Sequence, residues 1–271
     1  MSNRSTKYSN PKDPLITIIT PTYNREIWLP LTLKSLVEQT YEKWECIVQN
    51  DAGRSVQSII DSFNDPRIKY FENEKNLDLA GTRNEAIKNA SGDYFVLLDD
   101  DDQLYAECLE FRLGRIKKLN TDVVYSKVLQ NFYEPTQNGY RYAGDKRYWD
   151  SPFNRDLILI QNVSPCNGVM ASRRAYESSG PFDITLKTSE DWAKWVEMSR
   201  NFDFHESFMI DCQCSYRTDA SQMSGSRTGF TDHLPYLFKK WRKYAEDINF
   251  VTMHQNNALR GRNLNPADYG L

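Results

Sequence analysis

Short apolar runs rich in β-branched and aromatic residues alternate with helix-like segments over the first hundred residues of the chain. The runs are LITIIT (15–20), ECIVQ (45–49), IKYFE (68–72) and YFVLL (94–98). Between them, apolar residues recur at helical spacing, as at Leu29, Leu33 and Leu36 and again across 80–90. Strands that alternate with helices predict an α/β, Rossmann-like fold, in which helices flank a mostly parallel central sheet with right-handed crossovers.

Polar motifs follow three of these predicted strands. PTYNR follows the first strand, NDAG follows the second, and the acidic run DDDD (99–102) follows the fourth. Ligands of open parallel sheets bind outside the carboxyl ends of the strands. We therefore expect the three motifs, although far apart in sequence, to meet at one edge of the sheet and to form the functional site there.

The four consecutive aspartates have two interpretations. Like charges repel one another, so such a run weakens a fold unless water or a cation offsets it. A solvated turn is what most acidic runs form. The alternative is a site for Mg²⁺ or Mn²⁺, since hard cations bind carboxylate and phosphate oxygens and alternate residues on a turn, such as Asp99 and Asp101, can face one point.

Two more charged residues are candidates for ligand binding. Asp51 ends the second strand, where it could accept a hydrogen bond from an imide N–H such as that of uracil, or cap the helix that follows. NLDLAGTRNEA (76–86) places Arg83 early in a helix, and a guanidinium there could bind phosphate oxygens bidentately. A surface role is the alternative for a single arginine on a helix.

The second half of the chain has a looser pattern. We expect a helix through Leu109 and Leu119, one or two strands over 122–133, a long loop or substrate-facing insertion over 134–165, a helix over 189–200, a strand over 209–217 and a C-terminal helical stripe. The expected organisation is a disordered polar tail (1–13), one domain (14–228) divided into two halves (14–106 and 107–228), and a C-terminal helical extension (229–271).

Charge, hydropathy and cysteine usage narrow the classes of partner. The formal net charge of −3 gives no indication of nucleic acid binding. No apolar run approaches the ~20 residues that cross a bilayer, and the polar N-terminus lacks a signal-peptide segment. Five cysteines without metal-ligand spacing predict buried free thiols in a reducing, cytoplasmic compartment. Cations beside Trp241 could contact the inner face of an anionic membrane, although packing of that helix on the domain is the favoured interpretation.

The motifs PTYNR, NDAG, NLDLAGTRNEA, YFVLLDDDD and SEDWAKW occur in an order that resembles the family 2 glycosyltransferases of the GT-A fold, over about residues 14–200. The resemblance implies transfer of a sugar, with inversion, from a nucleotide diphosphate donor to a hydroxyl of a glycan or lipid-linked glycan acceptor, assisted by Mn²⁺ or Mg²⁺. Asp191 matches the catalytic base and Glu190 its acidic neighbour. A first-turn carboxylate that balances the helix dipole is the alternative role of Asp191.

The resemblance also implies that the first half of the domain (14–106) is the nucleotide-binding half and the second (107–228) the acceptor-binding half, and it implies roles for residues of the other motifs. The residues expected to bind the nucleotide are Thr20, Pro21, Tyr23, Arg25, Asp51 (base), Arg83 (diphosphate), Asp99 and Asp100. Those expected to bind metal are Asp101 and Asp219, and those expected to shape the donor-sugar and acceptor pocket are Asp102, Asn167, Gly168 and Trp192. The chain departs from the family pattern at Asn50, where an acid is commoner, and at Asp219, where a histidine often stands.

The candidate functions are a glycosyltransferase, a nucleotidyltransferase and a catalytically silent binding module. For a glycosyltransferase, the nucleotide of the donor can be predicted. UDP is the expected nucleotide because an acid at the second strand end suits the N–H of uracil, although thymine and guanine offer the same donor. A nucleotidyltransferase would need a glycine-rich, lysine-bearing loop after the first strand, and PTYNR has neither residue. A catalytically silent nucleotide- or carbohydrate-binding module is disfavoured, because Asp51, Arg83, Asp101 and Asp191 are all present.

Overall fold

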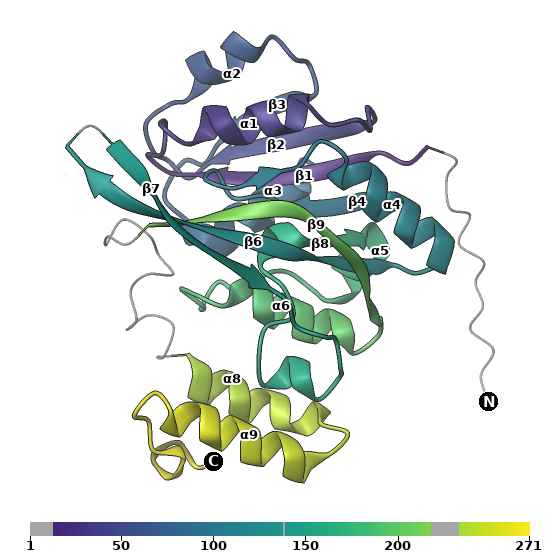
Figure 1. Ribbon diagram of the computed structural model, residues 1–271, viewed down its shortest axis with the longest axis vertical. Coiled ribbons are helices and arrows are strands. Elements are labelled where there is room, and N and C mark those ends of the chain that lie inside the picture. The colour runs from purple at the N-terminus through teal and green to yellow at the C-terminus, as the bar shows by residue number, and fades with distance from the viewer. Residues whose placement is uncertain (1–12, 138, 218–232) are drawn as a thin grey trace.

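The computed structural model describes residues 13–137, 139–217 and 233–271, and these form a layered α/β structure (Figure 1). One nine-stranded sheet runs through it in the order β3-β2-β1-β4-β8-β6-β9-β5, with β7 paired to β6 outside this path. The strands are β1 (Ile16–Thr22), β2 (Trp44–Asn50), β3 (Ile68–Glu72), β4 (Tyr94–Leu97), β5 (Gln103–Leu104), β6 (Val123–Thr136), β7 (Gly139–Trp149), β8 (Val169–Ser172) and β9 (Phe204–Arg217).

The first four strands are parallel, as the alternating pattern predicts. β1 pairs with β2 on one side and β4 on the other, and β2 pairs with β3. Every residue of β1, β2 and β4 is buried, which is typical of parallel strands covered on both faces. Ile18 packs into the core cluster on one face and Ile19 into the cluster on the other. The carboxyl ends of β1, β2 and β4 therefore lie at one edge.

Helices cover both faces of the sheet. Residues of α1, α2 and α4 join the core cluster of Ile18, and residues of α3, α5 and α6 join that of Ile19. The bounds are α1 (Leu29–Val37), α2 (Gln57–Phe63), α3 (Asp78–Lys88), α4 (Cys108–Leu119), α5 (Arg173–Ser178) and α6 (Glu190–Ser199). Short 3₁₀ turns, η1 (Leu157–Leu159) and η2 (Cys166–Gly168), precede β8.

The second half of the sheet contains a hairpin that the sequence did not predict. β6 and β7 pair antiparallel, and Gly139, with φ +128°, begins β7, so the expected loop over 134–165 is wrong for 134–136 and 139–149. Most of the described side chains near the turn are partly or fully exposed, and such a hairpin lacks the apolar alternation of a half-buried strand. On the side of β6 away from β8, the sheet continues with β9, which runs parallel to β6. The end of β9 therefore lies at the same edge of the sheet as the end of β1.

In residues 233–271, the part of the C-terminal extension that the structure describes, there are two α-helices, where the apolar stripe suggested one. They are α8 (Leu234–Trp241) and α9 (Ile248–Arg260), with η4 (Arg242–Tyr244) between them and η5 (Pro266–Tyr269) after them. Asp247 caps α9 by accepting from the backbone N–H groups of Asn249 and Phe250, both at 3.0 Å. Figure 1 shows the pair stacked beyond α6, away from the sheet.

The apolar face of α8 packs on the domain. Trp241 is fully buried, and its ring centroid lies 5.0 Å from that of Trp192 in α6. The packing interpretation of this helix is therefore confirmed, while membrane contact through its cations stays a prediction. Among the described residues, no helix is both long and apolar enough to cross a membrane. All five cysteines are buried free thiols, as expected. Residues 1–12 of the predicted tail lie outside the described ranges, and the domain division stays a prediction.

Candidate active site

A pocket of about 920 Å³ opens at the carboxyl ends of β1, β2 and β4. Its walls include Tyr23 and Arg25 after β1, Asp51 after β2, and all four aspartates after β4. The predicted meeting of PTYNR, NDAG and DDDD at one sheet edge is thus confirmed. Other lining residues come from the second half of the chain, among them Asp191 at the start of α6, and the C-terminal extension contributes Arg262.

The acidic loop is not a solvated turn. Asp100, Asp101 and Asp102 are only 4%, 7% and 5% exposed. Arg25 Nη1 lies 2.6 Å from Asp101 Oδ2 and 3.4 Å from Asp100 Oδ1. Arg217, from the end of β9, donates to the same Asp101 oxygen at 2.7 Å. Two guanidinium groups therefore hold the residue that the resemblance assigns to the metal.

The negative charge of this loop is only partly compensated. The Thr22 hydroxyl donates to Asp100 at 2.7 Å and the Ser215 N–H donates to Asp102 at 2.9 Å. Burial, together with repulsion from Asp101, raises the pKa of Asp100 to about 7 and that of Asp102 well above its usual value. A divalent cation would relieve this repulsion, and carboxylate oxygens are the ligands that Mg²⁺ and Mn²⁺ prefer, so the residues present fit the predicted metal.

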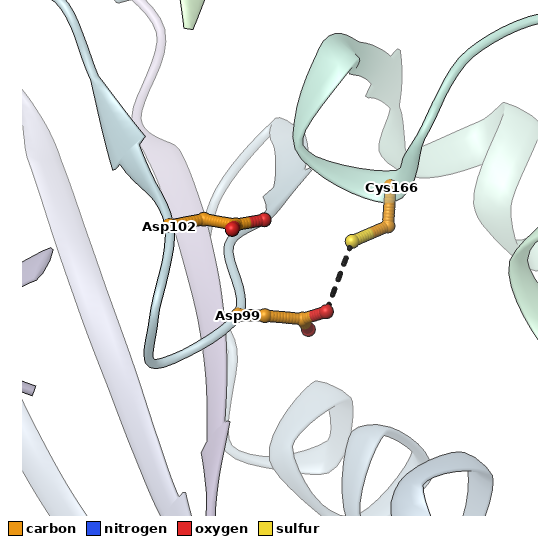
Figure 2. A group of neighbouring side chains, drawn as sticks. All are labelled: Asp99, Asp102 and Cys166. Carbon is orange, nitrogen blue, oxygen red and sulfur yellow. Dashed lines mark hydrogen bonds between the residues drawn. The ribbon is translucent and has the colours of Figure 1, made fainter. Parts of the chain in front are cut away.

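Three possible ligand atoms converge beside this loop. Among the residues that the structure describes, one oxygen each of Asp99 and Asp102 and the sulfur of Cys166 lie within 4.8 Å of one another. Figure 2 shows the three side chains, with Asp99 Oδ2 3.5 Å from Cys166 Sγ. Burial raises the pKa of the Cys166 thiol well above its ordinary value. Asp101 is not a member of this group, and Asp219, the other predicted ligand, lies outside the described residues.

Arg83 links the acidic loop to α6. Its guanidinium, in a residue only 1% exposed, donates from Nη2 to Asp99 Oδ1 at 2.6 Å and from Nη1 to Glu190 Oε1 at 2.5 Å. It therefore does not have the surface role that a single helical arginine usually has. Contact of Arg83 with a diphosphate stays a prediction, and in this structure its two nearest anions are the protein's own carboxylates.

Asp51 fixes the backbone in front of α3. Its Oδ1 accepts from the Leu77 N–H at 2.7 Å and from Asn73 Nδ2 at 2.8 Å, and it lines the pocket. The helix that follows it directly, α2, has no side-chain cap, so the capping alternative is wrong for that helix. Asn50, which replaces the commoner acid, donates to the Tyr70 hydroxyl at 2.9 Å and accepts from the Gly53 N–H at 3.0 Å. It shapes the turn that presents Asp51.

Glu190 and Asp191 begin α6 but differ in their environments. Glu190 is 6% exposed and paired with Arg83. Asp191 is half-buried, lines the pocket, and accepts from its neighbour's N–H at 2.6 Å and from Asn162 Nδ2 at 3.3 Å. Burial, and then repulsion from Glu190, raises the pKa of Asp191 to about 7, although Arg83 opposes the shift. A carboxylate with a pKa near neutrality suits a general base.

The remaining predicted residues lie at different depths. Pro21 and Trp192 line the pocket, whereas Thr20, Asn167 and Gly168 do not. Thr20 is fully buried beneath it, and its hydroxyl lies 3.6 Å from Cys46 Sγ. An added Cβ at Gly168 would approach Ser164 Oγ to 2.0 Å, so this glycine allows the tight turn that presents Cys166. Trp192 donates from its indole to the Ile158 carbonyl at 2.6 Å and supports the pocket from behind.

Sequence reasoning missed three residues of the site. Thr22 contacts Asp100, Arg217 contacts Asp101, and Cys166 contacts both Asp99 and Arg83. Thr22 was within reach, since it belongs to the PTYNR motif at the same strand end. Arg217 lies in the predicted strand 209–217, two residues before the candidate Asp219, and this strand (β9) returns to the same edge. Nothing in the local sequence marks Cys166, because its neighbours come from positions 67 and 83 residues away.

Comparison with known proteins agrees with this geometry. The model of the family described as "Glycosyl transferase family 2" matches residues 17–180. WcaA of Escherichia coli (strain K12), named for colanic acid biosynthesis, is 31% identical over 69% of this chain, and the chain spans 66% of that relative. The UDP-Glc:alpha-D-GlcNAc-diphosphoundecaprenol beta-1,3-glucosyltransferase WfgD of Escherichia coli is 29% identical over 79% of this chain and 81% of its own.

Solved structures share the fold at low sequence identity. S. aureus TarS 1-349 in complex with UDP-GlcNAc superposes with a TM-score of 0.70 at 18% identity, covering 90% of this chain and 71% of TarS. The mannosyltransferase PcManGT of Pyrobaculum calidifontis, in complex with GDP-Man and Mn²⁺, gives a TM-score of 0.63 at 16% identity, covering 92% and 73%. The predicted GT-A architecture is thereby confirmed.

Proposed function

Because the chain belongs to glycosyl transferase family 2 and is a glycosyltransferase, we propose that it transfers a sugar from a UDP-sugar to a hydroxyl of a glycan or lipid-linked glycan, with inversion. The observation that carries this proposal is the pocket itself. It brings Asp51, the acidic loop and Asp191 together in one cavity, which therefore offers groups for both the donor and the acceptor.

The donor side offers recognition for each part of a nucleotide sugar. Asp51 is fixed by Leu77 and Asn73 through one oxygen, and its carboxylate at the pocket wall would accept from the N–H of uracil. The Arg25 side chain is 24% exposed, so its guanidinium would contact a diphosphate while it keeps its hydrogen bond to Asp101. We assign nucleotide contacts also to Pro21 and Tyr23, which lie on the same wall. WfgD, whose printed name gives UDP-Glc as its donor, supports the choice of UDP.

The metal would be held by the aspartates of the acidic loop. When bound there, Mn²⁺ or Mg²⁺ would stabilise the negative charge that develops on the leaving diphosphate. The protein's own contribution is to hold these carboxylates at fixed positions through Arg25, Arg217 and the Ser215 N–H. The Mn²⁺ complex of PcManGT, which shares this fold, supports a cation of this kind.

Asp191 is our candidate for the base. Inversion requires a group that accepts the proton of the attacking hydroxyl, and the hydrogen bonds from Asn162 and the Trp192 N–H fix the Asp191 carboxylate at the pocket wall. Glu190 is less suited, since its carboxylate is paired with Arg83. We assign to Glu190 a positioning role, in which it holds Arg83 and the start of α6. Cytoplasmic location stays a prediction.

The test is a UDP-release assay over a panel of UDP-sugars with Mn²⁺ and a lipid-linked N-acetylhexosamine acceptor, comparing wild type with Asp191→Asn. We expect acceptor-dependent release by the wild type from one donor, and loss in the variant with UDP affinity retained. Equal release by both proteins would remove Asp191 from the mechanism. UDP binding without release from any donor would favour the silent binding module.

A further inference from the structure

Cys166 lies where a cation in the acidic loop would meet its side chain. Its sulfur is 3.5 Å from Asp99 Oδ2, and the sulfur and one oxygen each of Asp99 and Asp102 lie within 4.8 Å of one another. Tetrahedral Zn²⁺ has Zn–S bonds of about 2.3 Å and Zn–O bonds of about 2.1 Å, so its sulfur and oxygen ligands are separated by about 3.6 Å. The 3.5 Å between the sulfur and Asp99 Oδ2, which is a thiol–carboxylate hydrogen bond in this structure, is close to that separation.

Neighbouring groups orient all three ligands. Asp99 uses Oδ1 for Arg83 and keeps Oδ2 toward the sulfur, while Asp102 accepts from the Ser215 N–H. Gly168 lacks the Cβ that would collide with Ser164 Oγ, so the backbone of the turn that carries Cys166 packs closely on Ser164. Hydrogen bonds that hold metal ligands in place are a regular part of metal sites and strengthen binding. Figure 2 shows the side chains of Asp99, Asp102 and Cys166 directed toward one another.

We propose that Asp99, Asp102 and Cys166 form a cation site with one sulfur and two carboxylate ligands, which binds Zn²⁺ and Co²⁺ more tightly than Mg²⁺. Thiolate is a ligand for softer transition metals, whereas Mg²⁺ takes oxygen ligands. Binding through sulfur forms the metal–sulfur bond and releases the thiol proton to solvent. The inference rests on the proposed function, because it names ligands within the same donor pocket. The sulfur ligand would make the enzyme bind thiophilic cations more tightly than a site made of aspartates alone would.

The test is a titration of the full-length protein, without nucleotide, with Co²⁺, followed by absorption spectroscopy and calorimetry. A Co²⁺–thiolate bond gives a sulfur-to-metal charge-transfer band in the near ultraviolet. We expect this band in the wild type and its loss in Cys166→Ser, with Co²⁺ and Zn²⁺ affinity lowered at least about tenfold and Mg²⁺ affinity unchanged. Cys214→Ser is the matched control, because Cys214 is also a buried cysteine of this pocket but not of the group of three; it should keep the band.

Circular dichroism of each variant checks its fold. If Cys166→Ser is unfolded, Asp102→Asn replaces it, since this variant keeps the thiol and should lower Co²⁺ affinity to a similar degree. Co²⁺ binding without the band, no Co²⁺ binding at all, or a band that survives in Cys166→Ser would each overturn the inference. None of these results affects UDP release by the wild type, so failure of this site and failure of the proposed reaction are distinguishable.

Discussion

Replacing Arg83 with methionine should destabilise the protein strongly, because it leaves two carboxylates without their common cation. Arg83 is 1% exposed and holds Asp99 and Glu190 at 2.6 Å and 2.5 Å. Breaking a buried ion pair by removing one partner costs about 3–5 kcal/mol. An unfolding entropy of about 2.1 cal/mol/K per residue gives about 0.57 kcal/mol/K for 271 residues. The expected fall in Tm is therefore about 5–9 °C.

Differential scanning calorimetry of Arg83→Met and a matched control measures this effect. Arg54 pairs with Glu26 at 2.7 Å, but its side chain is 72% exposed, so Arg54→Met should cost under about 1 kcal/mol and lower the Tm by less than about 2 °C. The double variant Arg83→Met/Glu190→Gln should recover part of the loss, since one unpaired charge is removed. Equal Tm values for Arg83→Met and Arg54→Met would refute the claim that Arg83 stabilises the protein by pairing with Asp99 and Glu190.

Three further predictions concern the base, the extension and the turn that carries Cys166. The pKa of Asp191 is raised to about 7, so kcat/KM should fall as the pH drops below about 7, because the base is then protonated. The rate of Asp191→Asn should be about 10²–10⁴-fold lower than that of the wild type and should show no such pH dependence. Trp241→Ala should lower the free energy of unfolding by about 3–5 kcal/mol in denaturant titrations, because it deletes a fully buried ring packed on Trp192; unchanged stability would mean that the extension is not docked. Gly168→Ala should cost about 1–3 kcal/mol, since its Cβ would meet Ser164 Oγ at 2.0 Å, and a variant as stable as the wild type would show that the turn can relax.

The position of the site followed from the sequence because it depends on strand direction alone. Periodicity placed IKYFE on β3 (Ile68–Glu72) with the same bounds as the structure, and placed the starts or ends of β1, β2 and β4 within two residues. Once these strands are parallel, PTYNR, NDAG and DDDD must share an edge. The family motifs then added Asp191, which no local pattern would have joined to the acidic loop.

The contacts inside the site did not follow from the sequence, because they are made between elements. The sequence around Asp101 does not indicate an ion-pair partner for its carboxylate. Arg217 comes within 2.7 Å of it only because β9 returns to this edge of the sheet. Arg83 appears as a surface residue of a helix, but packing of α6 on the sheet places Glu190 against it. The break between α8 and α9 was marked by Asp247, a helix-capping residue, which the continuous apolar stripe obscured.

The central claim is that this pocket binds a nucleotide diphosphate together with a divalent cation. A thermal-shift screen of UDP, GDP, dTDP, CDP and ADP, each with and without Mn²⁺, measures it directly, since a ligand that binds the native state raises the Tm by mass action. We predict a Mn²⁺-dependent rise with UDP that is lost in Asp51→Ala. No shift with any nucleotide at saturating Mn²⁺ would contradict the account.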